Sequence, residues 1–127
     1  MAVATFDPLS RRVIGCAIEV HRAIGPGLLE SAYQQCLARE LSEAGIPFKM
    51  EAPVPLRYKG ALMDCAFRAD FVIEDKLIVE LKCVDHLLRI HEAQLLAYMR
   101  LAKCGVGLLI NFNVPLLRLE GIRRFVL

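Results

Sequence analysis

The sequence predicts an α/β fold: one domain over residues 1–127, with a mixed β-sheet flanked by helices in the order ααβββαββ. Apolar residues recur at helical spacing near the start, whereas from residue 47 the period changes to two, which is typical of strands. Hydrophobic residues make up 56% of the chain and charged residues 24%, which favours a globular protein over a disordered one. A chain of 127 residues can bury roughly two-thirds of its unfolded surface.

The first third of the chain is predicted to form two helices. Asp7 followed by a proline is a good N-cap and first-turn pair for a helix over about residues 8–24. The run Gly25-Pro26-Gly27 breaks this helix. A second helix is expected from about Leu28 to Ala44, and Gly45 suits its C-terminal end.

Strands are predicted for most of the remainder. Three prolines make the stretch from Pro47 to Tyr58 an irregular or edge strand, and Lys59-Gly60 turns the chain. The later elements are expected as a strand from Met63 to Glu74, a strand from Leu77 to Val84, a helix from Ile90 to Lys103 near Gly105, a strand from Val106 to Phe112, and one or two short pieces within residues 116–127.

Charged residues interrupt the two apolar strands of the predicted hairpin. If the turn is centred on Asp75, Asp70 faces Glu80 and Arg68 faces Lys82. Directly opposed Cβ atoms lie only about 4.5–5.5 Å apart in an antiparallel pair. Two carboxylates held that close repel each other unless they share a proton or a cation. A divalent metal with a lysine beside it is the economical explanation, and we therefore predict a metal-dependent active site.

The spacing of Asp70 and Glu80-Leu81-Lys82 resembles the core motif of the PD-(D/E)XK nuclease superfamily, which includes many restriction endonucleases, junction resolvases and RecB-type nucleases. The superfamily core is helix, three strands, helix and strand, which matches the predicted order from the second helix onward. The resemblance therefore implies a restriction-endonuclease-like core preceded by an extra helix over about residues 8–24. Ala69 stands where the superfamily name has a proline, a position that varies within the superfamily.

The nearest resemblance is to the small GxxExxY subfamily, whose pattern is present as Gly27-Leu28-Leu29-Glu30-Ser31-Ala32-Tyr33. Further matches are Ile78-Val79-Glu80-Leu81-Lys82, the pair Gln94 and Tyr98, and Gly107-Leu108-Leu109-Ile110-Asn111-Phe112. A single D…ExK match would be weak, because such triplets arise often by chance. Four motifs in the right order on the right elements cover nearly the whole chain and make the resemblance specific.

The resemblance implies that Asp70, Glu80 and the backbone carbonyl of Leu81 bind Mg²⁺ or Mn²⁺, ions that prefer oxygen ligands. Lys82 would orient the attacking water or stabilise developing negative charge. The alternative is a structural salt-bridge network of the same side chains, which is commoner than an active site in an arbitrary domain. Charges that interrupt an apolar strand favour the metal site.

Two helix faces supply further candidates. Glu30 lies in the first turn of the second helix, where it either complements the helix dipole or adds an acid facing the metal; the sequence leaves both open. Tyr33, one turn on, is expected to pack or hydrogen-bond at the site. Gln94 and Tyr98 share a face of the later helix and form either an exposed polar stripe or, as the resemblance implies, a contact to Lys82, water or phosphate with Tyr98 in support.

Other polar residues are weaker candidates. His91 and Arg68 are secondary candidates for contacts to substrate, whereas His21 and His86 indicate nothing specific. The arginine clusters near the two ends matter only if folding brings them beside the carboxylates. The five cysteines form no C-x-x-C pair, which favours reduced core thiols over a disulfide, zinc or iron–sulfur site: Cys16, Cys36, Cys65, Cys83 and Cys104.

We therefore expect a metal-dependent nuclease that hydrolyses phosphodiester bonds in nucleic acid, with DNA favoured over RNA as the partner. The alternative is a catalytically weak nucleic-acid-binding or oligomeric interaction module on the same fold. A mean hydropathy of +0.44 is high for a small monomer and favours a homodimer. The short apolar runs and the start from Met1 to Phe6 predict no membrane span and no signal peptide, hence a cytoplasmic protein. The sequence does not determine whether the substrate is single-stranded, double-stranded or branched, whether cleavage is endonucleolytic or exonucleolytic, or which biological pathway is served.

Overall fold

The computed structural model describes residues 7–64 and 67–127. The prediction for Met1–Phe6 and the thiol of Cys65 therefore lie outside the described residues. The elements in chain order are α2 (Pro8–Ile24), α3 (Glu30–Glu43), β1 (Phe48–Val54), β2 (Arg57–Tyr58), β3 (Ala61–Leu62), β4 (Phe67–Ile73), β5 (Leu77–Lys82), α4 (Arg89–Ala102), β6 (Val106–Asn111), the π-helical turn η1 (Leu117–Gly121) and β7 (Ile122–Val126).

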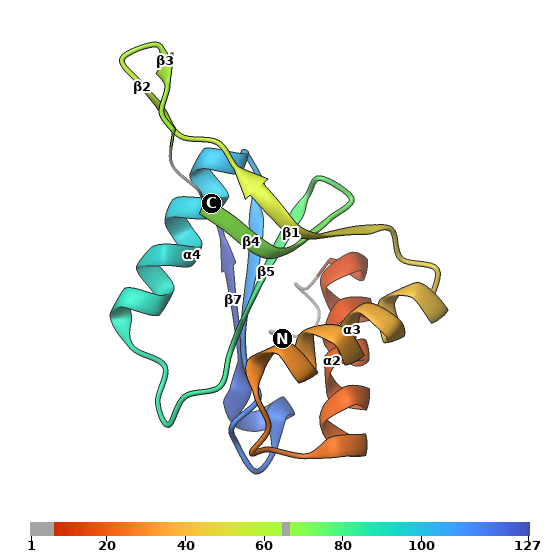
Figure 1. Cartoon of the computed structure of the whole chain (residues 1–127). Helices are drawn as coiled ribbons and strands as arrows, with labels where there is room; N and C mark the ends of the chain where they lie inside the picture. The colour runs from red at the N-terminus through yellow and green to blue at the C-terminus, as the bar shows by residue number, and fades with distance from the viewer. Residues whose placement is uncertain (1–6, 65–66) are drawn as a thin grey trace.

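Five of the strands form one mixed sheet in the order β1-β4-β5-β6-β7. The neighbours β5 and β6 are parallel, because α4 carries the chain back along the sheet between them, and the other pairs are antiparallel. Figure 1 shows α2 and α3 on one face of this sheet and α4 on the other. The predicted α/β fold with a mixed sheet between helices is confirmed, and β1 lies at the edge as its prolines indicate.

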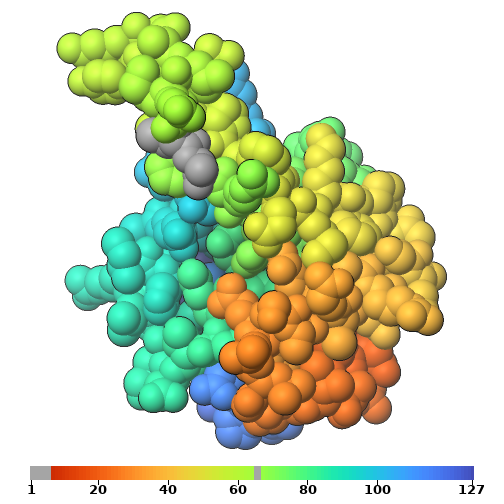
Figure 2. All heavy atoms as spheres, viewed as in Figure 1, coloured from red at the N-terminus to blue at the C-terminus, as the bar shows by residue number. Residues whose placement is uncertain are grey.

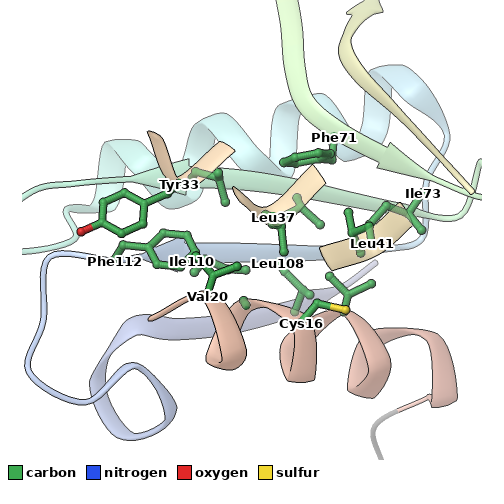
Figure 3. Close-up of a cluster of buried hydrophobic side chains, with 14 of the residues drawn as sticks. Cys16, Val20, Tyr33, Leu37, Leu41, Phe71, Ile73, Leu108, Ile110 and Phe112 are labelled. Atoms are coloured by element: carbon green, nitrogen blue, oxygen red, sulfur yellow. The ribbon is translucent and has the colours of Figure 1, made fainter. Parts of the chain in front are cut away.

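Each face of the sheet has its own hydrophobic core. Under α2 and α3, the ring of Tyr33 stacks on Phe112 with centroids 4.4 Å apart, next to Leu37 and Ile110 in Figure 3. Under α4, the core is closely packed at Gly107. A Cβ built there would lie 2.5 Å from the sulfur of Met99, so the missing side chain lets α4 approach β6 closely. The two cores fix both helical layers against the strands that end at the candidate site.

The predicted helix ends are largely correct. The side chain of Asp7 accepts a hydrogen bond from the backbone nitrogen of Ser10 at 2.9 Å and caps α2. At the end of α3, Gly45 has φ +72°, and the backbone nitrogen of Ile46 donates to the carbonyl of Leu41, which closes the helix in a Schellman motif. The start of α3 is later than predicted, at Glu30 rather than Leu28.

The predicted strand from Pro47 to Tyr58 is two elements. The chain leaves the sheet after Val54, and Arg57 begins β2, which pairs only with β3 in a separate two-stranded sheet. Lys59 and Gly60 have φ +48° and +82°, so the predicted turn there is correct and closes this small hairpin. Figure 1 shows the β2–β3 hairpin projecting away from the main sheet. The physical reason is Pro55, which has no N–H for continued pairing.

The hairpin of β4 and β5 has the predicted register. Phe71 pairs with Val79 and Ile73 with Leu77, so opposed residues are equidistant from Asp75. Both Glu74 and Asp75 adopt left-handed backbone angles, with φ of +53° and +55°, as the central residues of a type I′ hairpin turn do.

Two arginines near the chain ends join elements that are far apart in the sequence. Arg12 donates to the carbonyl of Ala44 at 2.8 Å, and Arg124 pairs with Asp7 at 2.9 Å. Cys16, Cys36, Cys83 and Cys104 are free thiols, as expected. In the part of the chain that the structure describes, no helix has the length and apolar character needed to span a membrane.

Candidate active site

The site lies where the pairing of β4 with β5 ends. Phe71 and Val79 are the last paired residues, and beyond them the carboxylates of Asp70 and Glu80 take over the hydrogen bonds. The backbone nitrogen of Asp70 donates to Oε2 of Glu80 at 2.8 Å, and that of Leu81 donates to Oδ2 of Asp70 at 2.7 Å. Within residues 7–64 and 67–127, Oδ1 of Asp70 and Oε1 of Glu80 accept no hydrogen bond. Each carboxylate is therefore held through one oxygen, and its other oxygen has no hydrogen-bond donor among the described residues.

Burial makes this pair of acids costly in the charged form. The side chain of Glu80 is 5% exposed, and burial, reinforced by the charge of Asp70, raises the pKa of Glu80 to about 8. Burial also raises the pKa of Asp70, and the charge of Glu51 adds to that rise. Either a bound proton or a cation close to the free carboxylate oxygens would relieve this cost.

Lys82 connects the strand to α4. Its Nζ donates to Oε1 of Gln94 at 3.3 Å, and Nε2 of Gln94 donates to the hydroxyl of Tyr98 at 3.3 Å. Among the described residues, no ion pair within 4.0 Å joins Lys82 to Asp70 or Glu80. The salt-bridge network considered above is absent from this part of the chain. The geometry agrees with the expectation that Gln94 contacts Lys82 and that Tyr98 supports Gln94.

Glu30 reaches the site from the opposite face, at the first residue of α3. Desolvation and then the charge of Asp70 raise the pKa of Glu30, whereas the charge of Lys82 lowers it. Because these groups influence one another, Glu30 lies near the other acids as well as at the start of a helix. Both roles left open by the sequence are compatible with this position. In Figure 2, α3 and α4 flank the surface over this end of the sheet.

Tyr33 acts on the loop before α3 and not on the acids. Its buried hydroxyl donates to the carbonyl of Gly25 at 2.5 Å and accepts from the backbone nitrogen of Leu28 at 3.2 Å. Gly27, between them, has φ +101°, a conformation that other residues avoid. The loop, and with it the position of Glu30, is therefore held by the Tyr33 hydroxyl.

Replacing Tyr33 with phenylalanine is expected to lower the free energy of unfolding by about 1–2 kcal/mol, because two hydrogen bonds are lost while the ring keeps its stack on Phe112. Urea unfolding of both proteins measures the difference. Tyr58→Phe is the matched control, since Tyr58 is 59% exposed and should be neutral. An equal effect of the two substitutions would contradict the role given to Tyr33.

Asn111 holds the end of β5. Its buried side chain accepts from the backbone nitrogens of Val84 at 3.1 Å and Asn113 at 3.2 Å, and it donates to the carbonyl of Val84 at 2.9 Å. The backbone nitrogen of Phe112 donates to the carbonyl of Lys82 at 3.0 Å. These bonds fix the strand end from which Lys82 projects, which gives a physical reason for Asn111 in the last matched motif.

Sequence reasoning missed two polar residues beside the site. Gln34 donates from Nε2 to Oε2 of Glu51 at 2.8 Å and to the carbonyl of Asp70 at 3.5 Å. Gln34 follows Glu30 by four residues, so their shared helix face was a usable signal. Glu51 had no such signal, because its φ of +50° interrupts the strand geometry of β1 between the pairs Met50–Phe71 and Ala52–Ala69.

The secondary candidates take other roles. Arg68 donates to the backbone carbonyl of Glu51 at 3.3 Å, and among the described residues it makes no ion pair with Asp70 or Glu80. The ring of His91 accepts from the backbone nitrogen of Leu88 at 2.9 Å and so helps to cap α4. His21 is buried with Nε2 within hydrogen-bonding distance of two carbonyls, so its role there is structural.

Comparison with known families agrees with this geometry. The model of the PD-(D/E)XK nuclease superfamily matches residues 7–125, nearly the whole chain. The chain belongs to the PD-(D/E)XK nuclease superfamily. Comparisons with curated proteins and with solved structures gave no match.

Within the matched range, Asp70, Glu80 and Lys82 stand in the order of the acids and lysine that give the PD-(D/E)XK superfamily its name, and Ala69 stands where that name has a proline. In residues 7–64 and 67–127, no three histidine, cysteine or acidic side chains already gather as a metal-binding group. The two free carboxylate oxygens are nevertheless hard donors of the kind that Mg²⁺ and Mn²⁺ prefer, and the donor chemistry therefore fits these ions.

Proposed function

We propose that this protein is a metal-dependent nuclease that hydrolyses phosphodiester bonds in DNA. The observation that carries the proposal is the exchange of hydrogen bonds between Asp70, Glu80 and the facing backbone. It leaves one oxygen of the buried Glu80 carboxylate and one oxygen of the half-buried Asp70 carboxylate without a hydrogen bond among the described residues. Membership of the superfamily supports nuclease chemistry and a nucleic-acid substrate. The Gly27–Tyr33 pattern supports placing the chain in the GxxExxY subfamily, with residues 1–127 as one domain.

Asp70, Glu80 and the backbone carbonyl of Leu81 would hold Mg²⁺ or Mn²⁺, with Glu30 as a further oxygen donor. When bound, the ion polarises the scissile phosphate and lowers the pKa of the attacking water. Gln94 accepts one hydrogen bond from the Lys82 ammonium, so the remaining N–H groups of Lys82 can orient the water or stabilise charge on the phosphate. Tyr98 holds the amide of Gln94 in this orientation.

The test is calorimetric titration of Mn²⁺ into the full chain, with cleavage of plasmid DNA, single-stranded DNA and RNA measured on the same samples. We expect metal binding, DNA cleavage only with added metal, and loss of cleavage on chelation. Metal binding with no cleavage of any substrate would favour the catalytically weak binding module. Absence of metal binding would overturn the proposal.

Replacing Lys82 with methionine is expected to reduce cleavage about 10²–10³-fold without weakening Mn²⁺ binding, because a positive charge for the transition state is lost while the side chain keeps its length. Lys76→Met, in the exposed hairpin turn, is the matched control. Cleavage rates and calorimetry of the three proteins measure both effects. Equal cleavage by the wild type and Lys82→Met would rule out the role given to Lys82.

A further inference from the structure

A surface hollow of about 540 Å³ lies at the C-terminal end of α4, away from Gln94. Its charged lining comes from four cations and one acid: Lys49, Arg57, Arg100, Lys103 and Asp75. The positive side chains come from β1, β2 and the end of α4, segments that are far apart in the sequence. The formal charge of this lining is +3, whereas the whole chain carries only +2. Positive charge is therefore concentrated here.

Most of that charge is not used for folding. Asp75 pairs with Lys49 at 3.4 Å, which accounts for the single acid. Within the ranges that the structure describes, Arg57, Arg100 and Lys103 make no ion pair, and all three side chains are exposed. Arg100 and Lys103 also complement the dipole of α4, but Arg57 belongs to another element and has no such role.

Helix α4 contributes residues both to the hollow and to the candidate active site. Gln94, which contacts Lys82, and Arg100 lie on the same helix, six residues or about 9 Å apart along its axis. Arg57 also begins the β2–β3 hairpin, which projects from the rest of the molecule (Figure 2). On this hairpin Tyr58 is 59% exposed, and Nζ of Lys59 lies 5.5 Å from the centre of the Tyr58 ring.

We propose that this basic hollow binds the phosphate backbone of the nucleic-acid substrate outside the candidate active site, through Arg57, Arg100 and Lys103. The proposal rests on the proposed function for the identity of the ligand, and it extends that function from the acids to a separate anchoring surface. Guanidinium and ammonium groups from β2 and from the end of α4 suit a chain of phosphates, which neutralises several of these cations at once. Contacts to phosphate carry no base information, so this anchor binds independently of sequence.

The test measures binding of fluorescein-labelled DNA, duplex and single-stranded, by anisotropy in the presence of a chelator, which prevents turnover. The triple variant Arg57→Glu, Arg100→Glu, Lys103→Glu is expected to bind about tenfold or more weakly, with a salt dependence reduced by about 2–3 units of slope. The matched control reverses three exposed arginines elsewhere: Arg11→Glu, Arg22→Glu and Arg118→Glu. If circular dichroism shows that this triple variant does not fold, the variant with glutamine in place of glutamate at the same three positions replaces it.

The outcomes separate this proposal from the proposed function. Equal losses of DNA affinity in the hollow variant and the control variant would overturn the DNA-binding role of the hollow, even if the wild type cleaves DNA. A loss of DNA affinity in the hollow variant, with unchanged affinity in the control variant, would support the DNA-binding role of the hollow, even if the wild type cleaves nothing. Competition by polyglutamate as strong as that by unlabelled DNA at the same charge concentration would overturn the choice of nucleic acid and identify an acidic polypeptide as the occupant.

Discussion

Replacing Asp70 with asparagine is expected to abolish metal-dependent cleavage and to weaken Mn²⁺ binding strongly, while the fold is kept. Asparagine has nearly the same shape and retains an oxygen that can accept the hydrogen bond from the backbone nitrogen of Leu81. The negative charge is the main property removed. A structural role of Asp70 as a hydrogen-bond acceptor would survive this substitution, whereas a role as a metal ligand would not.

The alanine variant provides a second measurement of the same residue. Asp70→Ala removes the acceptor as well as the charge and leaves the N–H of Leu81 without its partner, which costs about 1–3 kcal/mol of stability. We therefore expect equal losses of cleavage for the two variants and a larger loss of stability for alanine. Calorimetry, plasmid cleavage and urea unfolding measure the three quantities.

Asp64→Asn is the control, because Asp64 is exposed and lies outside both the candidate active site and the basic hollow. The control should bind metal and cleave like the wild type. Full cleavage activity in Asp70→Asn would exclude a metal role for this carboxylate.

The sequence predicts the β4–β5 hairpin well because its determinants are local. Register depends on a turn centred on Asp75, and the alternation of side chains then places Asp70 beside Glu80. The prediction that these residues face each other as an ordinary strand pair was too simple. Beyond Phe71 and Val79, the carboxylates themselves accept the backbone hydrogen bonds, an arrangement that a pattern of residue types does not reveal.

The parts that sequence reasoning missed depend on contacts between distant segments. Glu51 lies beside Asp70 because β1 pairs with β4 and because a positive φ interrupts the strand at that residue. Arg57 and Arg100 line one hollow only after the small hairpin and α4 have packed on the sheet. In the sequence, the visible clusters of positive charge are the arginines near the chain ends, but Arg124 from one of these clusters pairs with Asp7.

Replacing Glu80 with glutamine is expected to abolish cleavage and, in the metal-free protein, to raise stability at alkaline pH. The pKa of Glu80 is raised from 4.5 to about 8, chiefly by burial. Between these values the folded state binds more protons than the unfolded state, so the free energy of unfolding of the wild type falls as pH rises through this window. The limiting slope is about 1.4 kcal/mol per pH unit.

Glutamine cannot ionise, and its amide oxygen can still accept the hydrogen bond from the backbone nitrogen of Asp70. The variant should therefore lack this fall in stability and exceed the wild type by about 2–4 kcal/mol at pH 8 to 9, with a small difference near pH 5. Urea unfolding of both proteins at several pH values, in chelator, measures this difference. Glu74→Gln, in the exposed turn, is the control and should follow the wild type.

Added Mn²⁺ should reverse the order of stability at pH 8. A cation that binds only the folded wild type stabilises it by mass action, whereas Glu80→Gln loses a ligand and gains little. This reversal distinguishes a carboxylate whose burial destabilises the protein only in the absence of a bound cation from one whose burial destabilises it whether or not the cation is present. If the wild type stayed less stable than the variant at saturating Mn²⁺, Glu80 would not be a metal ligand, and its burial would need another explanation.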